Sequence, residues 1–411
     1  MRLILDLSRT LSRATHPVPT GIDRVEMAYA RWLIEHEPGA LSFAACHPIG
    51  RVGTLPYTPT VAMLNEVGAR WAGDTNAPDT ATIARTTRSL RNRLLLRGDV
   101  PTGSRLRPRR KDAVYLLMSH HHLDRSAIVD AAARRRNAAL IVLVHDLIPL
   151  EFPEYARANE PARHARRMET VAQLADGIVV NSEATGLALR PWLQRAGRDV
   201  PVLTALLGAD VPVRAAVDPS PHPHLYFVLI GTVEPRKNHL LLLHLWRRLA
   251  AELGPATPHL VLIGRRGWEN EQIVDLIERC AALRPVLSEH GDLSDAQTQA
   301  WVRGACAVLL PSFAEGYGLP VAEALAQGVP VLCSDLPALR EVGGDVPDYL
   351  DPLDGLGWRQ AILDYVAPGS PRRQAQLGRL AGWTPPSWDR HVAAAIGFAL
   401  KLIERTPPGQ R

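Results

Sequence analysis

Two glutamates eight positions apart, Glu315 and Glu323, stand in the glycine-containing stretch FAEGYGLPVAEALAQG (313–328). Gly316 and Gly318 allow a tight turn and a close approach of the backbone to a ligand. The pattern after Gly318 predicts a short helix, and the free N–H groups at its start favour an anion such as a diphosphate. Carboxylates accept hydrogen bonds from sugar or ribose diols. The stretch therefore indicates a phosphate-and-diol site, with a solvated surface and a helix cap as the alternative.

Two cations form a second candidate in IGTVEPRKNH (230–239), where a predicted strand ends at Gly231. Arg236 and Lys237 precede a predicted helix that Asn238 would cap. An arginine can hold a diphosphate through two parallel hydrogen bonds, and a lysine can hold it as a point charge. The segment lacks the Walker pattern. Two solvated charges at a turn are the alternative interpretation.

A third candidate lies at the predicted end of a buried strand, where His145 and Asp146 follow an apolar run. An imidazole there could hydrogen-bond a sugar hydroxyl or stabilise a nearby charge, and a purely structural histidine is the alternative. Thr20 and Gly21 open another predicted helix, which is weak evidence by itself. The three histidines at 120–122 do not predict a metal site, because neighbouring strand residues point to opposite faces.

Short apolar runs must position these residues. They alternate with helical patterns, and they are apolar continuously, which is typical of parallel strands buried on both faces. The predicted class is therefore α/β, with two doubly wound parallel sheets. The proline-rich segment 211–224 is predicted to be a linker between them. The predicted strands are 3–7, 113–118, 140–145, 177–182, 202–206, 225–231, 259–264, 306–311 and 329–334.

Composition narrows the class of protein. The 411 residues are 46% hydrophobic and 22% charged, with four scattered cysteines and a net charge of +5. These values predict a soluble two-domain protein without a disulfide framework, and they do not indicate nucleic-acid binding. The segment 85–111 holds ten Lys or Arg and one acid. A solvated insertion and a contact with anionic lipid or a lipid-diphosphate acceptor are the two main interpretations, with nucleic acid the least favoured.

Taken together, several motifs resemble the retaining glycosyltransferases of the family 4 type. They are EGYGLPVAE, which is similar to the Glu-x7-Glu signature with Tyr317 in place of phenylalanine, and GTVEPRKN, HDLIP, VVNSEAT, IGRRGWE and GDLSDAQ. The resemblance implies the GT-B fold, with two Rossmann-like domains facing across a cleft. It implies an acceptor-binding domain at 1–210, the linker at 211–224, a nucleotide-sugar domain at 225–387, and a final helix at 388–411 that crosses back.

The resemblance also implies roles for single residues. Glu323 would bind the donor ribose, Glu315 the hydroxyls of the transferred sugar, and Arg236 and Lys237 the diphosphate, while His145 would lie near the reacting carbon. In all, the implied donor-binding residues are Gly21, Gly231, Arg236, Lys237, Glu315, Gly316, Tyr317, Gly318, Leu319 and Glu323. Many members have Gly-Arg where this chain has Gly231-Thr232, so the diphosphate would depend on Arg236 and Lys237.

The expected reaction is transfer of a hexose, with mannose from GDP-mannose as the first expectation, to a hydroxyl of a glycan or lipid-linked acceptor with retention of configuration. The sequence has no Asp-x-Asp, so we expect a metal-independent enzyme without a cofactor, located in the cytoplasm or on the inner face of the membrane. Base selection is expected near 265–268 and 291–293. The alternatives are an inactive sugar-nucleotide-binding or membrane-surface module and a GT-B relative such as a glycan phosphorylase.

Overall fold

The computed structural model describes residues 1–97, 111–209 and 221–404, and these fall into two compact units. The first unit comprises Met1–Leu150, Ala158–Leu207 and Trp388–Arg411. The second comprises Glu151–Arg157 and Gly208–Ser387. Within the described ranges, no helix combines the length and the apolar composition that crossing a bilayer requires.

A seven-stranded sheet forms the centre of the first unit, in the order β3-β2-β1-β4-β5-β6-β7. All neighbouring strands are parallel except β2 and β3, which form an antiparallel pair at one edge. Every residue of β4 and β5 is buried, as expected for central strands covered on both faces. The strands are β1 (Arg2–Asp6), β2 (Leu41–Cys46), β3 (Val52–Leu55), β4 (Ala113–Leu117), β5 (Ala138–Val144), β6 (Gly177–Val180) and β7 (Val202–Thr204).

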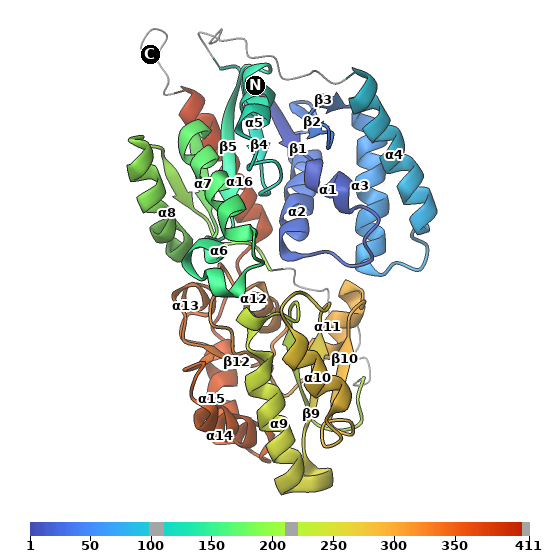
Figure 1. The fold of residues 1–411 in the computed structure, drawn as a ribbon, viewed down its shortest axis with the longest axis vertical. Helices are drawn as coiled ribbons and strands as arrows, with labels where there is room; N and C mark the ends of the chain where they lie inside the picture. Colours follow the sequence, from blue (N-terminus) through green and yellow to red (C-terminus); the bar gives the residue numbers. More distant parts are fainter. Residues whose placement is uncertain (98–110, 210–220, 405–411) are drawn as a thin grey trace. The chain divides into compact units, whose positions relative to one another are not determined.

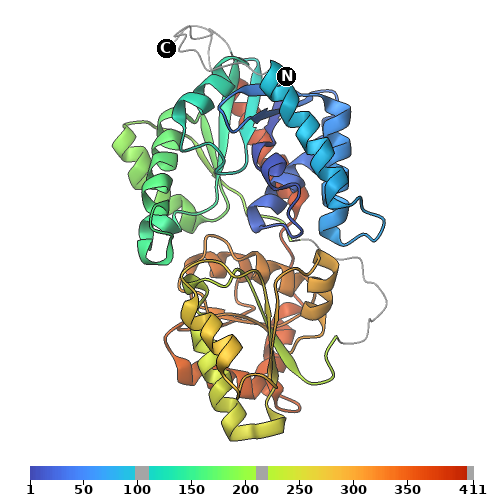
Figure 2. The ribbon, with the colours of Figure 1, turned by 45° about the vertical axis from the view of Figure 1, so that its right-hand side comes forward.

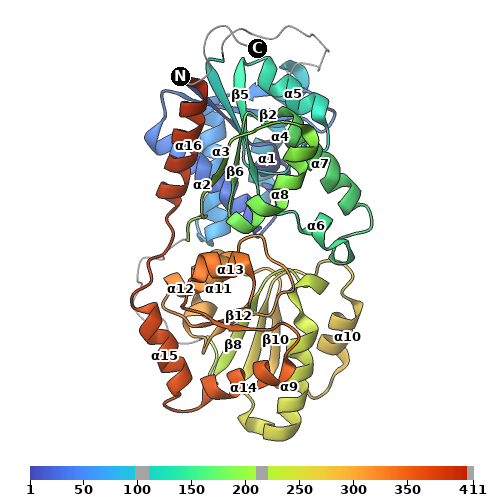
Figure 3. The same cartoon turned by 90° about the vertical axis from the view of Figure 1, so that its left-hand side faces the viewer.

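Helices cover both faces of this sheet. One buried core joins β1, β4, β5 and β6 to α5, α7 and α8, whereas α2 and α16 lie together on the opposite side (Figure 3). Figure 1 shows α3 and α4 side by side near β3. The helices are α1 (Ser8–Arg13), α2 (Gly21–His36), α3 (Tyr57–Ala72), α4 (Thr80–Arg97), α5 (Ser126–Arg134), α6 (Ile148–Glu151), α7 (Glu160–Leu174), α8 (Glu183–Ala196) and α16 (Trp388–Glu404).

The last helix, α16, packs closely on β6 at Gly177. A Cβ atom added at Gly177 would lie 2.5 Å from Cδ1 of Leu402 and 2.9 Å from Cε1 of Phe398. The missing side chain lets the apolar face of α16 approach the sheet directly. The C-terminal segment is therefore a structural part of the first unit.

The second unit contains a six-stranded parallel sheet in the order β10-β9-β8-β11-β12-β13. β8 lies centrally, next to both β9 and β11. Because the strands are parallel, their carboxyl ends meet at one edge, where ligands of open α/β sheets bind. The strands are β8 (Tyr226–Ile230), β9 (His259–Ile263), β10 (Leu287–His290), β11 (Val308–Leu310), β12 (Val331–Ser334) and β13 (Asp348–Leu350).

One core of this unit joins α9, α10 and α14 to the sheet, with the fully buried Trp246 and Trp358 among its largest side chains. Figure 2 shows α9 and α10 side by side along one face of the sheet. The helices are α9 (His239–Leu253), α10 (Glu271–Arg279), α11 (Asp295–Arg303), α12 (Leu319–Ala326), α13 (Pro337–Gly343), α14 (Gly355–Val366) and α15 (Pro371–Leu380), with the 3-10 turns η1 (Pro153–Tyr155), η2 (Pro235–Lys237) and η3 (Gly254–Ala256).

The nine predicted strands are all present, and the structure adds four that were not predicted: β2, β3, β10 and β13. The segment Glu151–Arg157 groups with the second unit, although the predicted boundary places it within the first domain. Most of the predicted linker, and residues 98–110 of the basic segment 85–111, lie outside the described residues, which omit 98–110 and 210–220.

Candidate functional site

Three neighbouring strands of the second sheet, β8, β9 and β10, are each followed by a glycine: Gly231, Gly264 and Gly291. We call these three residues the glycine row. A Cβ atom at Gly264 would lie 1.9 Å from the carbonyl oxygen of Gly231, and both residues have a φ of +154°. Only glycine therefore fits at Gly264, and the backbones lie unusually close at the carboxyl edge of the sheet.

A cavity of about 370 Å³ opens beside the glycine row. Gly264, Arg265, Arg266, Glu289 and Gly291 line it, so it lies where β9 and β10 end. The volume is within the range of small-molecule sites. Both segments in which the sequence predicts base selection, 265–268 and 291–293, contribute to this lining.

The buried carboxylate of Glu315 lies between two cations. Lys237 Nζ donates to Glu315 Oε1 at 2.6 Å, and Arg236 Nη1 donates to Glu315 Oε2 at 3.0 Å. Ser312 Oγ also donates to Oε1, at 2.6 Å. Arg236 Nη2 donates to buried Glu234, and its Nη1 also donates to the carbonyl oxygen of Ala314. The loops after β8 and β11 are therefore joined by one ionic network.

Charge pairing determines the ionisation of this network. Burial by itself would raise the pKa of Glu315, but the adjacent Lys237 and Arg236 lower it to about 2, so the carboxylate is ionised at neutral pH. Burial lowers the pKa of Lys237, and the Glu315 carboxylate opposes that shift. The site thus retains opposite charges within hydrogen-bond distance in a place that largely excludes water.

The network keeps some capacity to bind a ligand. The Lys237 ammonium has three hydrogens and gives one to Glu315, and it has no other hydrogen-bond partner in the described ranges. Glu315 Oε1 accepts two hydrogen bonds and Oε2 accepts one, which leaves one acceptor position on Oε2. The side chain of Lys237 also passes over Gly231, where an added Cβ would lie 3.1 Å from Lys237 Cε.

The glycine-containing loop leads from this network into α12. Gly318 precedes the helix with a φ of +104°, and a Cβ there would lie 2.3 Å from Cδ2 of Leu339. Tyr317 is buried, Leu319 begins the helix, and Glu323 is half-buried in its second turn. The predicted helix start is confirmed. Asn238 precedes α9 as predicted, but it does not cap that helix: its side chain donates instead to the carbonyl oxygen of Pro352, at 3.0 Å.

Sequence reasoning missed the segment Glu151–Arg157, which we call the strap. The ring of Tyr155 stacks on Phe313, with centroids 5.6 Å apart, and the Tyr155 carbonyl accepts a 3.0 Å hydrogen bond from Trp268 Nε1. Arg157 lies 4.7 Å from the centre of the Trp268 ring. The strap therefore contacts both the loop before Glu315 and the loop beside the cavity. The two aromatic residues in its sequence FPEY were the available sign of a contact segment, but hydrophobic periodicity does not identify such contacts.

In the first unit, Thr20 and Gly21 begin α2 as predicted. Buried Asp23 accepts hydrogen bonds from the backbone nitrogen of Thr20 at 2.7 Å, from Arg9 Nε at 2.6 Å and from Arg13 Nε at 2.6 Å. Burial opposes ionisation of Asp23, but the two arginines and Thr20 hold its pKa below the ordinary value. This arrangement fixes the start of α2 and leaves Gly21 exposed.

His145 follows β5 and is buried in a group of three imidazoles. Its backbone nitrogen donates to His120 Nε2 at 3.1 Å, and its own Nε2 lies 2.9 Å from the carbonyl oxygen of Met118. His164 Nε2 lies 3.1 Å from the carbonyl oxygen of Asp146, so Nε2 carries the proton in both His145 and His164. Burial lowers the pKa of His145 to about 4, lowers that of His120 well below its ordinary value, and also lowers that of His164. These rings are neutral at pH 7.

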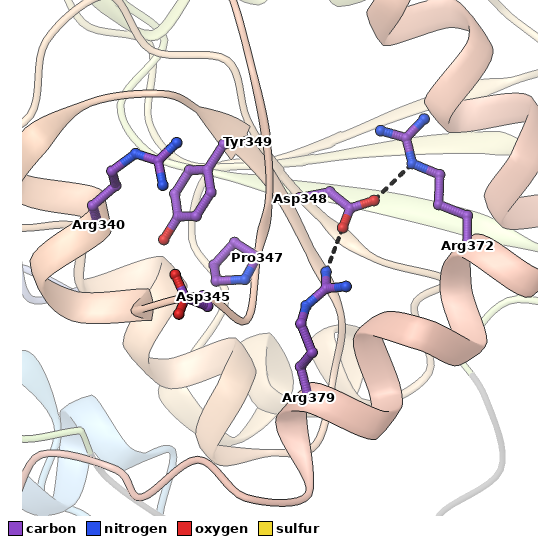
Figure 4. Close-up of a pocket in the computed structure, with 7 residues that line it drawn as sticks. All are labelled: Arg340, Asp345, Pro347, Asp348, Tyr349, Arg372 and Arg379. Carbon is purple, nitrogen blue, oxygen red and sulfur yellow. Dashed lines mark hydrogen bonds and ion pairs between the residues drawn. The ribbon is translucent and has the colours of Figure 1, made fainter.

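A second cavity, of about 420 Å³, lies at the opposite edge of the second sheet, beside β13 (Figure 4). Asp348 accepts hydrogen bonds from Arg372 Nε at 2.7 Å and from Arg379 Nη2 at 2.5 Å. Arg340 stacks on Tyr349 and pairs with Asp335. Each arginine that lines this cavity is thus paired with a carboxylate. The pairs that Arg372 and Arg379 form with Asp348 hold α15 against the edge strand β13. We assign this cavity a structural role.

The structure therefore brings Arg236, Lys237 and Glu315 together, with Gly231 beside them. Gly316, Tyr317, Gly318, Leu319 and Glu323 continue directly from this network along the chain. Gly21 and His145 belong to the first unit, each at the carboxyl side of its sheet. The roles assigned to these residues stay predictions.

Comparisons with known proteins show similarity to glycosyltransferases. Residues 224–365 match the family model described as glycosyl transferases group 1. The O-antigen chain mannosyltransferase B of Escherichia coli is 36% identical over 178 residues, which are 43% of this chain and 46% of that protein. A serotype-specific mannosyltransferase of Escherichia coli is 24% identical over 256 residues, covering 57% of this chain and 30% of that protein. The chain thus spans less than half the length of these relatives.

A solved structure is similar to this chain in fold. Sucrose-phosphate synthase from Thermosynechococcus elongatus matches with a TM-score of 0.59 and 15% identity, covering 98% of both chains. The predicted GT-B fold, with two Rossmann-like parallel-sheet domains, is confirmed. The matches together support a GT-B glycosyltransferase.

Proposed function

We propose that this protein is a retaining glycosyltransferase of the family 4 type that moves a hexose from a nucleotide-diphosphate sugar to a hydroxyl group. One observation carries the proposal: the ion-paired Glu315, Arg236 and Lys237 lie at the carboxyl edge of the second sheet, beside the glycine row. Mannose is the first choice of hexose, since two relatives are named mannosyltransferases. We propose a glycan or lipid-linked acceptor in surface polysaccharide synthesis, which the name of the O-antigen relative supports.

The proposed donor site uses groups of opposite charge. Lys237 and Arg236 would hold the diphosphate, with the start of α12 supplying further N–H donors. Glu315 would accept one hydroxyl of the transferred sugar at its remaining Oε2 position, and Glu323 would accept the ribose hydroxyls. The backbone around Gly231, Gly316, Tyr317, Gly318 and Leu319 would lie close to the donor, and Gly21 would approach it from the first unit.

The proposed chemistry is electrostatic. As the bond between the anomeric carbon and the diphosphate breaks, negative charge grows on the leaving phosphate, and the fixed cations stabilise it. The acceptor oxygen would bond to the anomeric carbon on the face from which the diphosphate leaves, and the departing phosphate oxygen would accept the proton of that hydroxyl, so the configuration is retained. Neutral His145, which can donate or accept a hydrogen bond, would contact a sugar hydroxyl near the reacting carbon. Because lysine and arginine supply the positive charge, the proposal includes no metal ion or cofactor.

The test uses the full chain with GDP-mannose and UDP-glucose in chelating buffer. Release of nucleoside diphosphate and transfer to an acceptor are measured, and proton NMR of the first product reports the anomeric configuration. We expect turnover without added metal, retained configuration, and loss of at least about 100-fold in kcat for Lys237→Met, as for removal of one transition-state donor. Absence of turnover and of nucleotide binding, or an inverted product, contradicts the proposal.

We also propose that α4 contacts an anionic membrane surface at the cytoplasmic face. Along α4, Arg85, Arg88 and Arg93 are exposed together with Leu96, and the helix contains no acidic residue. Such a surface suits anionic lipid headgroups. The protein should sediment with phosphatidylserine vesicles at low salt. A variant in which Arg85, Arg88 and Arg93 are all replaced by glutamine should no longer sediment with them. Equal sedimentation of the variant contradicts the contact.

A further inference from the structure

The strap connects two loops of the second unit that follow different strands. The Tyr155 ring stacks on Phe313 in the loop after β11, with centroids 5.6 Å apart and planes 9° from parallel. The carbonyl oxygen of Tyr155 accepts a 3.0 Å hydrogen bond from Nε1 of Trp268, which lies in the loop after β9. A single residue therefore contacts one loop through its ring and the other through its backbone.

Phe313 is bonded directly to the ionic network. Its backbone nitrogen donates to the carbonyl oxygen of Arg236 at 2.9 Å. The guanidinium of the same arginine donates to the Ala314 carbonyl oxygen at 2.7 Å and to Glu315 Oε2 at 3.0 Å. Arg236 therefore holds three consecutive residues of this loop, and the first of them carries the ring on which Tyr155 stacks.

Trp268 is connected to the same arginine from the other direction. The preceding residue, Gly267, donates its backbone N–H to the carbonyl oxygen of Val233 at 3.0 Å, and Asn270 Nδ2 donates to that oxygen at 2.9 Å. Val233 lies three positions before Arg236 in the loop after β8. The strap and the loops after β8, β9 and β11 are thus joined in a closed chain of contacts.

A closed chain of contacts restricts its members more than the separate contacts would. Each loop is attached to a neighbour on two sides, so breaking any one link leaves a loop attached on one side only. Residues in one such network affect one another, and their substitutions do not add independently. A displacement of about 1 Å in a binding group can cost about 100-fold in rate, so small loop movements matter.

We propose that Tyr155 is a positioning residue of the donor site: by closing this chain of contacts, it holds the loop that carries Glu315 against Arg236. The inference rests on the proposed function, because it assigns Tyr155 to the donor site of that reaction. It adds a residue that the sequence motifs do not indicate, since Tyr155 lies outside all of them.

Native-state hydrogen exchange of the full chain, read by mass spectrometry on peptides that cover 312–316, tests the position of the loop without any ligand. Tyr155→Leu removes the stacked ring and keeps an apolar side chain. We expect the Phe313 amide, which is bonded to Arg236, to exchange at least about tenfold faster in this variant. Tyr155→Phe should keep the wild-type rate, because the hydroxyl has no hydrogen-bond partner within the described ranges.

Calorimetry with free GDP and UDP tests whether this loop matters to the donor site. For whichever nucleotide the wild type binds more tightly, Tyr155→Leu should lower the affinity by about 3- to 30-fold, and Tyr155→Phe should keep it. Trp268→Phe removes the Nε1 donor and opens the same chain at its other link, so it should cause a similar loss. The double variant Tyr155→Leu, Trp268→Phe should bind no more than about twofold more weakly than the weaker single variant.

Trp32→Leu is the control for removal of a stacked ring. Trp32 stacks on His36 in the first unit, with centroids 4.3 Å apart. This variant should keep both the exchange rate at 312–316 and the nucleotide affinity. If Tyr155→Leu is too unstable to purify, the milder Trp268→Phe gives the same two measurements.

Three results would overturn the inference: wild-type exchange at 312–316 in Tyr155→Leu, a loss in Tyr155→Phe equal to that in Tyr155→Leu, or fully additive losses in the double variant. Nucleotide affinity that is unchanged in Tyr155→Leu would reject the role of Tyr155 and leave the donor proposal standing. If the wild type binds neither GDP nor UDP, the proposed function is rejected, and the role of Tyr155 in a donor site is rejected with it.

Discussion

The two sheets carry polar groups at equivalent carboxyl edges, but the electrostatics differ. In the first unit, His120, His145 and His164 are buried beside backbone carbonyls and one another, and burial keeps all three rings neutral. In the second, Glu315 is equally buried and yet ionised, because Lys237 and Arg236 lie within hydrogen-bond distance. Burial disfavours charge at both edges, and the presence of a partner of opposite charge decides the outcome.

This contrast separates two kinds of ligand recognition. A neutral imidazole both donates and accepts hydrogen bonds, so it complements hydroxyl groups at little cost. A buried ionic network holds charges already removed from water, so it can exchange one partner for a charged ligand. The fold is shared by both units, and the side chains at the strand ends set the chemistry.

The largest expected effect comes from removing one cation of the second unit. Lys237→Met leaves Glu315 buried with Arg236 as its remaining cation, which raises the pKa of Glu315 and destabilises the fold. We expect a loss of about 3–5 kcal/mol in the free energy of unfolding at pH 7, measured with urea. Adding Glu315→Gln to this variant should restore part of the loss, because the uncompensated charge is then removed.

Arg279→Met is the control for this variant. Arg279 pairs with Asp275 on an exposed helix surface, so its removal should cost less than about 0.5 kcal/mol. If Lys237→Met and Arg279→Met destabilise the protein equally, the contrast between a charged and a neutral edge is wrong.

An intermediate effect is expected from the glycine row, which has no counterpart after the strands of the first unit. Gly264→Ala places a Cβ 1.9 Å from the carbonyl oxygen of Gly231, so the two backbones must separate. We expect a loss of about 2–3 kcal/mol in thermal or urea unfolding, together with weaker nucleotide binding.

Gly197 in the first unit provides the comparison. It has a φ of +61° and no atom within 4 Å of an added Cβ, so Gly197→Ala should cost only about 1 kcal/mol. Equal losses for the two variants would show that close backbone approach at Gly264 does not matter.

The smallest effect is a change in pH dependence. The pKa of His145 is about 4 in the folded protein, whereas that of a histidine in an unfolded chain is about 6.5, so the unfolded chain binds more protons between these values. Stability is therefore lost as pH falls from about 6.5 towards about 4. His145→Gln, which can still donate to Met118, should reduce the loss between about pH 6.5 and pH 5 by about 1.5 kcal/mol.

Urea unfolding of the wild-type chain and of His145→Gln at several pH values measures this slope. Glu315 contributes no slope above about pH 5, because its carboxyl is ionised in both states there. An unchanged slope in His145→Gln would mean that the imidazole is not held neutral by burial.

Much of this architecture could be predicted from the sequence. The central strands are continuous apolar runs, which periodicity identifies directly. The missed strands β10 and β13 lie at the edges of the second sheet, and their sequences, LSEH and DYL, are short and partly polar. The missed β3 is likewise an edge strand, with only four residues. Edge strands are covered less completely, so they lack the signal that marks the centre.

The candidate residues were also predictable, but their pairing was not. The family resemblance assigns Glu315 to a sugar and Arg236 with Lys237 to a diphosphate, whereas the structure joins all three in one network. Lys237 and Glu315 are separated by 78 positions, and a single sequence gives no measure of such contacts. The same reason hides the stacking of Tyr155 on Phe313, because neither residue belongs to a periodic pattern.

The way in which the chain is divided between the two units limits how the protein can be cut into fragments or recombined with relatives. The chain passes between the units four times, after Leu150, Arg157, Leu207 and Ser387, so neither unit is one contiguous piece. A fragment of 208–387 would lack the strap that covers Phe313 and Trp268, and a fragment of 1–207 would lack α16 over Gly177. Chimaeras that exchange the second unit between relatives should therefore transfer residues 151–157 with it and leave α16 with the first unit.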